Sequence, residues 1–172
     1  LVTLGGADPD NVTLKVVKAL NLIGDPDLEV KIVVGPSNPH IESLKREILR
    51  SPFSVLLLPS VSNMPALMAW ADVAISAGGS TCWEFAFMGL PAIIITLADN
   101  QKPITEWLNK KGAALNLGWH NDVYPAGIKK SVRRLLNDKE KRDQISKSGK
   151  ELVDGEGVAR TIMHIKGERI RL

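Results

Sequence analysis

The sequence is poor in the features that mark several classes of protein. A single cysteine, Cys82, excludes a disulfide framework within the chain, so we expect a reducing, cytoplasmic location. No apolar run reaches the ~20 residues that a transmembrane helix needs. The 22 basic and 19 acidic residues are interspersed, and no basic stripe indicates a nucleic-acid partner. Three scattered histidines lack metal-ligand spacing, so we expect neither a metal nor a cofactor.

What remains is the composition of a globular domain. The chain has 172 residues, of which 44% are hydrophobic and 24% charged, which is enough for a sizeable core in one domain. It opens directly on an apolar run, residues 1–4, that reads as a strand. We therefore expect it to be the C-terminal part of a longer protein, cut at a domain boundary.

Short apolar runs alternate with segments of helical periodicity. Apolar residues at Val12, Val16 and Leu20, for example, share one face of a helix. Strands that alternate with helices predict βαβ units, and so an α/β fold: a doubly wound, Rossmann-like parallel sheet of about six strands. The predicted strands are 1–4, 30–34, 55–58, 73–76, 92–96 and 113–117, and the predicted helices are 11–22, 41–49, 65–70, 81–88, 103–110, 125–136, 139–151 and 158–164.

The loops after the predicted strands are small, polar or rich in glycine. In an open parallel sheet, ligands bind beyond the carboxyl ends of the strands. We therefore expect the loops to form one rim that holds the site. These loops are residues 5–11, 35–40, 59–64, 77–81 and 97–102.

The first of these loops contains two glycines, Gly5 and Gly6. Glycines at a strand end let the backbone approach a ligand closely and adopt positive φ. An equally good interpretation is a tight turn in which Asp10 or Asn11 caps the next helix. The loop is not G-x-G-x-x-G and no Walker lysine follows, which argues against dinucleotide and P-loop sites.

The stretch "AGGSTCWE" offers an anion site beside a carboxylate. Gly78 and Gly79 end a strand, and Ser80 or Thr81 can cap the helix that follows, whose free amides and dipole attract phosphate. Glu84, one turn further on, can accept hydrogen bonds from two vicinal hydroxyls of a ribose. The alternative is a capping box formed by Thr81 and Glu84. The local spacing fits both interpretations.

Polar side chains also follow the strongly apolar strand 92–96. Asn100 and Gln101 carry amides, which suit sugar hydroxyls and N-acetyl groups, whereas Asp99 or Asn100 can also simply cap the next helix. His40, in a rim loop, is the one histidine that we consider for ligand contact.

Other conspicuous residues are predicted to be structural. We expect Cys82 to be a small buried residue and not a nucleophile, and Trp83 and Phe85 to pack their helix against the sheet. The charged run 137–151 is predicted to be a solvated helix face. The irregular stretch 117–125 can face a cleft or merely link sheet to helix.

These residues carry a resemblance. The stretch "AISAGGSTCWEFAFMGLPAIIITLADNQ" resembles the donor-binding motif of the GT-B glycosyltransferase superfamily, in the branch of the lipid II-forming N-acetylglucosaminyltransferase. Within it, "GGADPDN", "SNMPALMAWADVAISAGGSTCWE" and "ADNQ" are similar to the UDP-sugar hydrolases of pseudaminic acid biosynthesis and to spore coat polysaccharide biosynthesis proteins. The resemblance covers roughly residues 1–114.

The resemblance implies two Rossmann-like domains that face each other across a cleft. This chain, residues 1–172, resembles the C-terminal domain, which binds a UDP-sugar, and the N-terminal domain with its catalytic histidine is absent. The implied activity is hydrolysis of a UDP-sugar to UDP and a free amino-deoxy sugar for cell-surface polysaccharide or nonulosonic acid synthesis. The alternatives are the donor domain of a UDP-sugar-dependent glycosyltransferase and a non-catalytic nucleotide-sugar-binding module.

Residue by residue, the resemblance also implies the binding roles. Asn100 and Gln101 would touch the donor sugar, and Glu84 the ribose. The remaining implied contacts are Val61, Ser62, Asn63 and Met64 for the uracil, Gly79, Ser80 and Thr81 for the diphosphate, and Gly5, Gly6 and Asp8 in the loop that faces the cleft.

Overall fold

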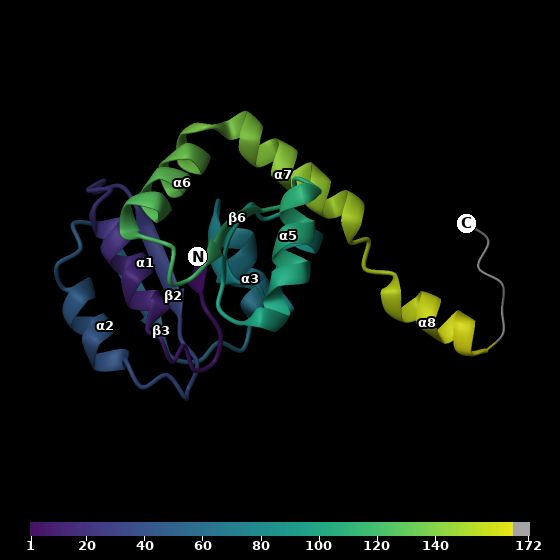
Figure 1. Cartoon of the computed structure of the whole chain (residues 1–172), viewed down its shortest axis with the longest axis horizontal. Coiled ribbons are helices and arrows are strands. Elements are labelled where there is room, and N and C mark those ends of the chain that lie inside the picture. The colour runs from purple at the N-terminus through teal and green to yellow at the C-terminus, as the bar shows by residue number, and fades with distance from the viewer. Residues whose placement is uncertain (167–172) are drawn as a thin grey trace.

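The computed structural model describes residues 1–166, which form a six-stranded sheet flanked by helices (Figure 1). The strand order is β3-β2-β1-β4-β5-β6, and every neighbouring pair is parallel. This confirms the predicted doubly wound, Rossmann-like α/β fold. The strands are β1 (Val2–Thr3), β2 (Glu29–Val33), β3 (Ser54–Leu58), β4 (Ala74–Ala77), β5 (Ala92–Thr96) and β6 (Leu115–Trp119).

Helices make the crossovers between these parallel strands, as parallel pairing requires. Within residues 1–166, no helix combines the length and the apolar character needed to cross a membrane. The helices are α1 (Val12–Asn21), α2 (Ile41–Ile48), α3 (Met64–Trp70), α4 (Thr81–Met88), the short 3-10 helix η1 (Asp99–Gln101), α5 (Lys102–Lys110), α6 (Pro125–Asn137), α7 (Lys139–Leu152) and α8 (Gly157–Ile165).

The pleat of β5 divides the core between two faces. Ile93 and Ile95 join a hydrophobic cluster with residues of α1 and α6, such as Ile128. Ile94 joins a second cluster with residues of α4 and α5, such as Phe85. Because both faces of the strand are buried, its sequence is continuously apolar instead of alternating.

The predicted start of the last strand is two residues too early. Ala113 and Ala114 are buried in the second cluster, but pairing with β5 begins at Leu115, opposite Ile93. Apolar residues that close the space between a helix and the sheet carry the same periodicity as a strand start, so the pattern could not separate them.

The last two helices differ in how they contact the rest of the domain. Helix α7 packs on α4, where a Cβ atom at Gly149 would lie 3.0 Å from Ala86, and Ile145 is buried while seven of the fourteen helix residues are exposed. This confirms the solvated face predicted for residues 137–151. Helix α8 extends away from the sheet (Figure 1), and its Val158 and Ile165 are 73% and 78% exposed.

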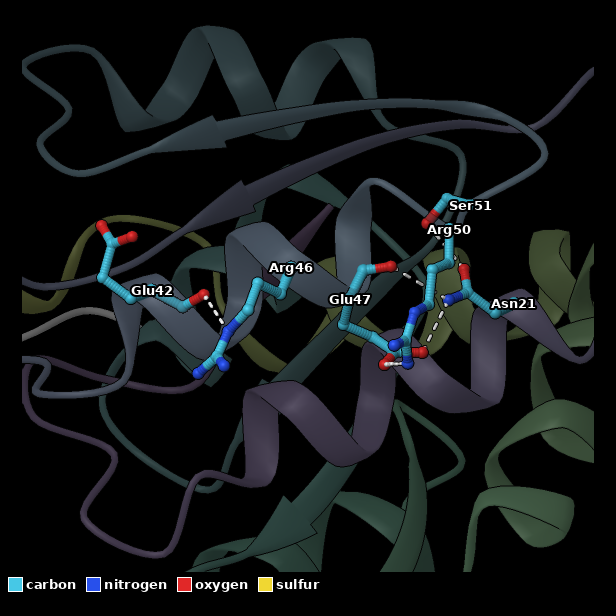
Figure 2. A network of polar contacts seen from close by, with 6 residues as sticks. All are labelled: Asn21, Glu42, Arg46, Glu47, Arg50 and Ser51. Atoms are coloured by element: carbon cyan, nitrogen blue, oxygen red, sulfur yellow. Dashed lines mark hydrogen bonds and ion pairs between the residues drawn. The ribbon is translucent and has the colours of Figure 1, made fainter.

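Polar contacts hold α2 to α1 at both ends. Asn21 of α1 donates from Nδ2 to Glu47 Oε1 of α2 over 3.0 Å and accepts a 2.6 Å hydrogen bond from Ser51 Oγ (Figure 2). At the opposite end, Asn11 Nδ2 donates to Ser43 Oγ over 3.3 Å. These contacts fix the position of α2 against α1.

Candidate functional site

The strand order reverses between β1 and β4. β1 pairs with β2 on one side and β4 on the other, so α1 and α4 begin next to neighbouring strand ends. In open parallel sheets, the crevice at this reversal is where ligands bind. The loop 5–11 after β1 and the loop 78–80 after β4 therefore form the centre of the candidate site.

Close backbone packing shapes the loop after β1. Gly5 has a φ of +92°, which favours glycine. A Cβ atom at Gly35, in the loop after β2, would lie 2.1 Å from the Gly6 carbonyl oxygen. His40 Nε2 lies 3.0 Å from the carbonyl oxygen of Pro9. His40 thus links two rim loops.

Asp8 caps helix α1. It is only 3% exposed, and its two carboxylate oxygens accept hydrogen bonds of 2.8 Å from the amides of Val12 and Thr13. Asn11 occupies the N-cap position, as one of the two predicted candidates, but in the left-handed conformation and without a capping side-chain hydrogen bond, so the side-chain cap comes from Asp8 instead. A carboxylate four residues before the first helical amide reaches it only because the loop folds back.

The start of α4 is not a capping box. Ser80 is the N-cap residue, its side chain makes no capping hydrogen bond, and Glu84 lies at the fourth helical position, where a box needs the third. The amides of Cys82 and Trp83 already bond to the carbonyls of Gly79 and Ser80. The amides of residues 79–81 therefore remain, and within residues 1–166 they have no acceptor.

Glu84 is exposed in the first turn of α4. Among residues 1–166, its carboxylate accepts no hydrogen bond and forms no ion pair. An exposed carboxylate next to open amides can take a ligand that carries both an anion and hydroxyl groups.

The loop after β5 is joined to the loop after β4 through Gln101. Its Oε1 accepts hydrogen bonds from the amides of Gly78, over 3.2 Å, and Leu97, over 2.9 Å. Within residues 1–166, no hydrogen bond uses its Nε2. Asn100 is exposed on the same turn, and Asp99 pairs with Lys102 at 2.6 Å.

The loop after β3 begins further away, because β3 is an edge strand separated from β4 by two others. Asn63 caps α3, its side-chain oxygen accepting from the Ala66 amide over 3.1 Å. Helix α3 then returns to pack against α4, with Met64 partly buried in the second cluster. Val61 and Ser62 lie in the loop before it, at the rim.

The residues that follow Thr81 have separate roles. Phe85 is 1% exposed and packs in the core, as predicted. Trp83 was predicted to pack against the sheet as well, but it is 38% exposed, and its ring contacts that of Trp107 edge-on, with centroids 5.7 Å apart. The position directly before Glu84 thus faces α5 and solvent. Cys82 is 2% exposed, and burial raises the pKa of its thiol to about 12, which confirms a structural cysteine.

His120 was not among the residues predicted for the site. It follows β6 at the rim, is 5% exposed, and its Nε2 lies 3.8 Å from Asp10 Oδ2 in the loop after β1. The only available signal was its place after a strand, in the irregular stretch 117–125. That signal applied equally to several neighbours.

A separate cavity of about 450 Å³ lies at the opposite edge of the sheet. Its lining includes Val2 and Val30 at the amino ends of β1 and β2, and Trp70, Asp72 and Val73 from the end of α3 and the connection to β4. It contains no residue of the rim loops. We place the candidate site at the rim because ligands in this fold bind at the carboxyl edge.

Comparison with known proteins gives consistent matches along the chain. Residues 1–158 match the model of the glycosyltransferase family 28 C-terminal domain. The spore coat polysaccharide biosynthesis protein SpsG of Bacillus subtilis is 32% identical over 161 residues, 93% of this chain and 47% of that protein. A UDP-N-acetylglucosamine--N-acetylmuramyl-(pentapeptide) pyrophosphoryl-undecaprenol N-acetylglucosamine transferase of Acidithiobacillus ferrooxidans is 28% identical over 92% of this chain and 45% of its own.

Solved structures agree on the fold. The crystal structure of Acinetobacter baumannii MurG superposes with a TM-score of 0.81 at 16% identity, over 96% of this chain and 48% of that one. A co-structure of S. aureus MnaA with UDP gives a TM-score of 0.74 at 17% identity, over 96% and 45%. The chain thus spans about half the length of the relatives it matches.

Proposed function

The chain belongs to the family of glycosyltransferase family 28 C-terminal domains, and on that basis we propose that it binds the donor of a UDP-sugar-dependent glycosyltransferase. The observation that carries the proposal is the start of α4 at the reversal of strand order. Its amides lack a side-chain cap, and the exposed Glu84 follows within one turn. We propose that the remaining catalytic groups belong to a second domain across a cleft.

In this proposal each rim loop takes one part of the donor. The amides of residues 79–81 and the dipole of α4 hold the diphosphate, and Glu84 accepts from the two ribose hydroxyls. As the glycosidic bond breaks, charge develops on the leaving UDP, so the same amides stabilise the transition state more than the ground state. Residues 61–64 contact the base, and Asn100 and the free Nε2 of Gln101 contact the sugar.

The loop after β1 has a more limited role in the proposed donor binding. Gly5 and Gly6 bring backbone close to the ligand. Asp8, whose carboxylate is occupied by the cap of α1, acts by holding that loop in place. We also propose a cytoplasmic location, which rests on the single cysteine alone.

The transferase is preferred to the hydrolase that the sequence resemblance implied. Relatives over most of this chain are named as N-acetylglucosamine transferases, whereas hydrolysis and a link to pseudaminic acid have no support beyond the resemblance. The two activities differ in what attacks the anomeric carbon, an acceptor hydroxyl or water, and both use the same donor pocket. An assay of the complete protein with UDP-N-acetylglucosamine, with and without a lipid-linked sugar acceptor, distinguishes them: sugar release without acceptor would favour the hydrolase.

The binding proposal is tested by calorimetric titration with UDP, and with ADP, GDP and phosphate as competitors of different chemistry. Selective UDP binding is expected. Glu84→Ala should weaken it by about 1.5–3 kcal/mol, the value of hydrogen bonds to a charged group. Glu106→Ala, which removes an exposed carboxylate from α5, is the matched control and should leave it unchanged. Equal affinity in both variants would remove Glu84 from the site.

A further inference from the structure

His120 and Asp10 meet at the rim from two distant parts of the sequence. Asp10 lies in the loop after β1, and His120 lies directly after β6. Three contacts position His120. Its backbone amide donates to the Thr96 carbonyl over 3.0 Å, and its backbone carbonyl accepts from Lys15 Nζ over 2.6 Å. Its ring packs on the ring of Trp119, with centroids 5.0 Å apart. The two hydrogen bonds fix the main chain of His120, and its buried ring is oriented by the contact with Trp119.

The gap between the two side chains has a specific size. His120 Nε2 is 3.8 Å from Asp10 Oδ2, too far for a direct hydrogen bond. An oxygen atom placed about 2.8 Å from each closes a triangle on that 3.8 Å side with good hydrogen-bond lengths. A hydroxyl group satisfies both partners, because it donates to the carboxylate while accepting from the Nε2–H of the ring.

The two side chains differ in their exposure to solvent. The His120 side chain is 6% exposed and the Asp10 side chain 58%, so the pair opens to the rim on the side of Asp10. Two nearby lysines are directed elsewhere: Lys15 Nζ donates to the His120 carbonyl, and Lys102 Nζ lies 4.8 Å from the centroid of the Trp119 ring. Neither fills the position between the imidazole and the carboxylate.

We propose that His120 and Asp10 form a subsite for a hydroxyl group of the donor's sugar. The inference rests on the proposed function, because the nucleotide must first be bound at α4. It adds a second sugar contact on the α1 side of the rim, opposite Asn100 and Gln101. Both residues are positioning residues, since each orients the sugar and neither takes part in bond breaking.

The test compares UDP with UDP-glucose and UDP-N-acetylglucosamine by calorimetric titration. His120→Phe keeps a ring against Trp119 but removes the donor, and it should weaken both UDP-sugars about 5- to 20-fold while leaving UDP unchanged. Asp10→Ala should do the same. His120→Gln, which places an amide N–H near the lost Nε2–H, should recover part of the affinity, and His164→Gln on the exposed α8 is the control.

The outcomes separate the two proposals. Equal weakening of UDP and the UDP-sugars, or no change in either, would overturn the subsite while the nucleotide site stands. If the unchanged chain binds neither UDP nor a UDP-sugar, the proposed function fails, and the subsite with it.

Discussion

The Oε1 atom of Gln101 accepts a hydrogen bond of 3.2 Å from the amide of Gly78, and so joins the rim loops after β5 and β4. The same oxygen accepts from the Leu97 amide over 2.9 Å. Gln101 thus has a structural role besides its proposed contact with the sugar. The loop that presents the α4 amides depends on a side chain 23 residues further along the chain.

Replacing Gln101 should therefore affect folding as well as binding. In Gln101→Leu two amides lose their acceptor, and the free energy of unfolding should fall by about 1–3 kcal/mol in urea denaturation. Asn100→Leu, at an exposed position on the same turn, should leave stability unchanged. If the two variants unfold at the same urea concentration, the bridge contributes nothing to stability.

The two glycines of "AGGS" should respond in opposite ways. A Cβ atom at Gly78 would lie 2.3 Å from Thr105 Cγ2, so Gly78→Ala should cost about 1–3 kcal/mol of stability through overpacking. A Cβ atom at Gly79 has nothing within 4 Å, so Gly79→Ala should fold normally and lose UDP affinity only, because its methyl group occupies ligand space. Thermal unfolding and UDP titration of both variants provide the measurement. Unchanged UDP affinity in Gly79→Ala would contradict close approach of the diphosphate.

Asp8→Ala should destabilise the fold without any ligand present. It removes the acceptor of two helix-start amides, and loss of a helix cap costs about 0.5–2 kcal/mol. Asp10→Ala, two residues on, removes an exposed carboxylate and should stay within about 0.5 kcal/mol of the unchanged chain. Equal stability of the two variants by denaturation would show that the cap is dispensable.

The thiol of Cys82 should be inert in the folded chain. Burial raises its pKa from 9.0 to about 12, so at pH 8 a thiol reagent should react only after unfolding by guanidinium. The folded state keeps a proton that the unfolded state loses above pH 9, so this cysteine stabilises the fold fully below that pH. Its contribution is lost as pH rises toward 12, with a slope of up to about 1.4 kcal/mol per pH unit. Cys82→Ala should lack that slope, and parallel pH curves would contradict the assignment.

Local sequence patterns were sufficient to predict the strands and helices. The run 92–96 and the helical period of 81–88 each fix their element from residues close in sequence, and both were predicted with the bounds observed. Parallel pairing then followed from alternation of strands and helices, because each crossover needs a helix. The position of the rim followed in turn, since all carboxyl ends of a parallel sheet meet at one edge.

Local patterns failed where a contact spans the chain. The cap of α1 by Asp8 depends on how its loop folds back, and the exposure of Trp83 depends on Trp107 from the next helix. His120 is a loop residue like its neighbours, and only the tertiary structure shows that it lies beside Asp10, 110 positions earlier.

By itself, then, the sequence determined the fold class and the residues available at the rim, because hydrophobic periodicity and strand–helix alternation are local properties. The tertiary structure alone decided which of those residues are already used by the protein and which remain for a ligand. Asp8 and the Oε1 of Gln101 are used, while Glu84 and the amides of residues 79–81 have no partner within residues 1–166. The physical reason is that hydrogen-bond satisfaction depends on atoms within about 3 Å in space, wherever they lie in the chain.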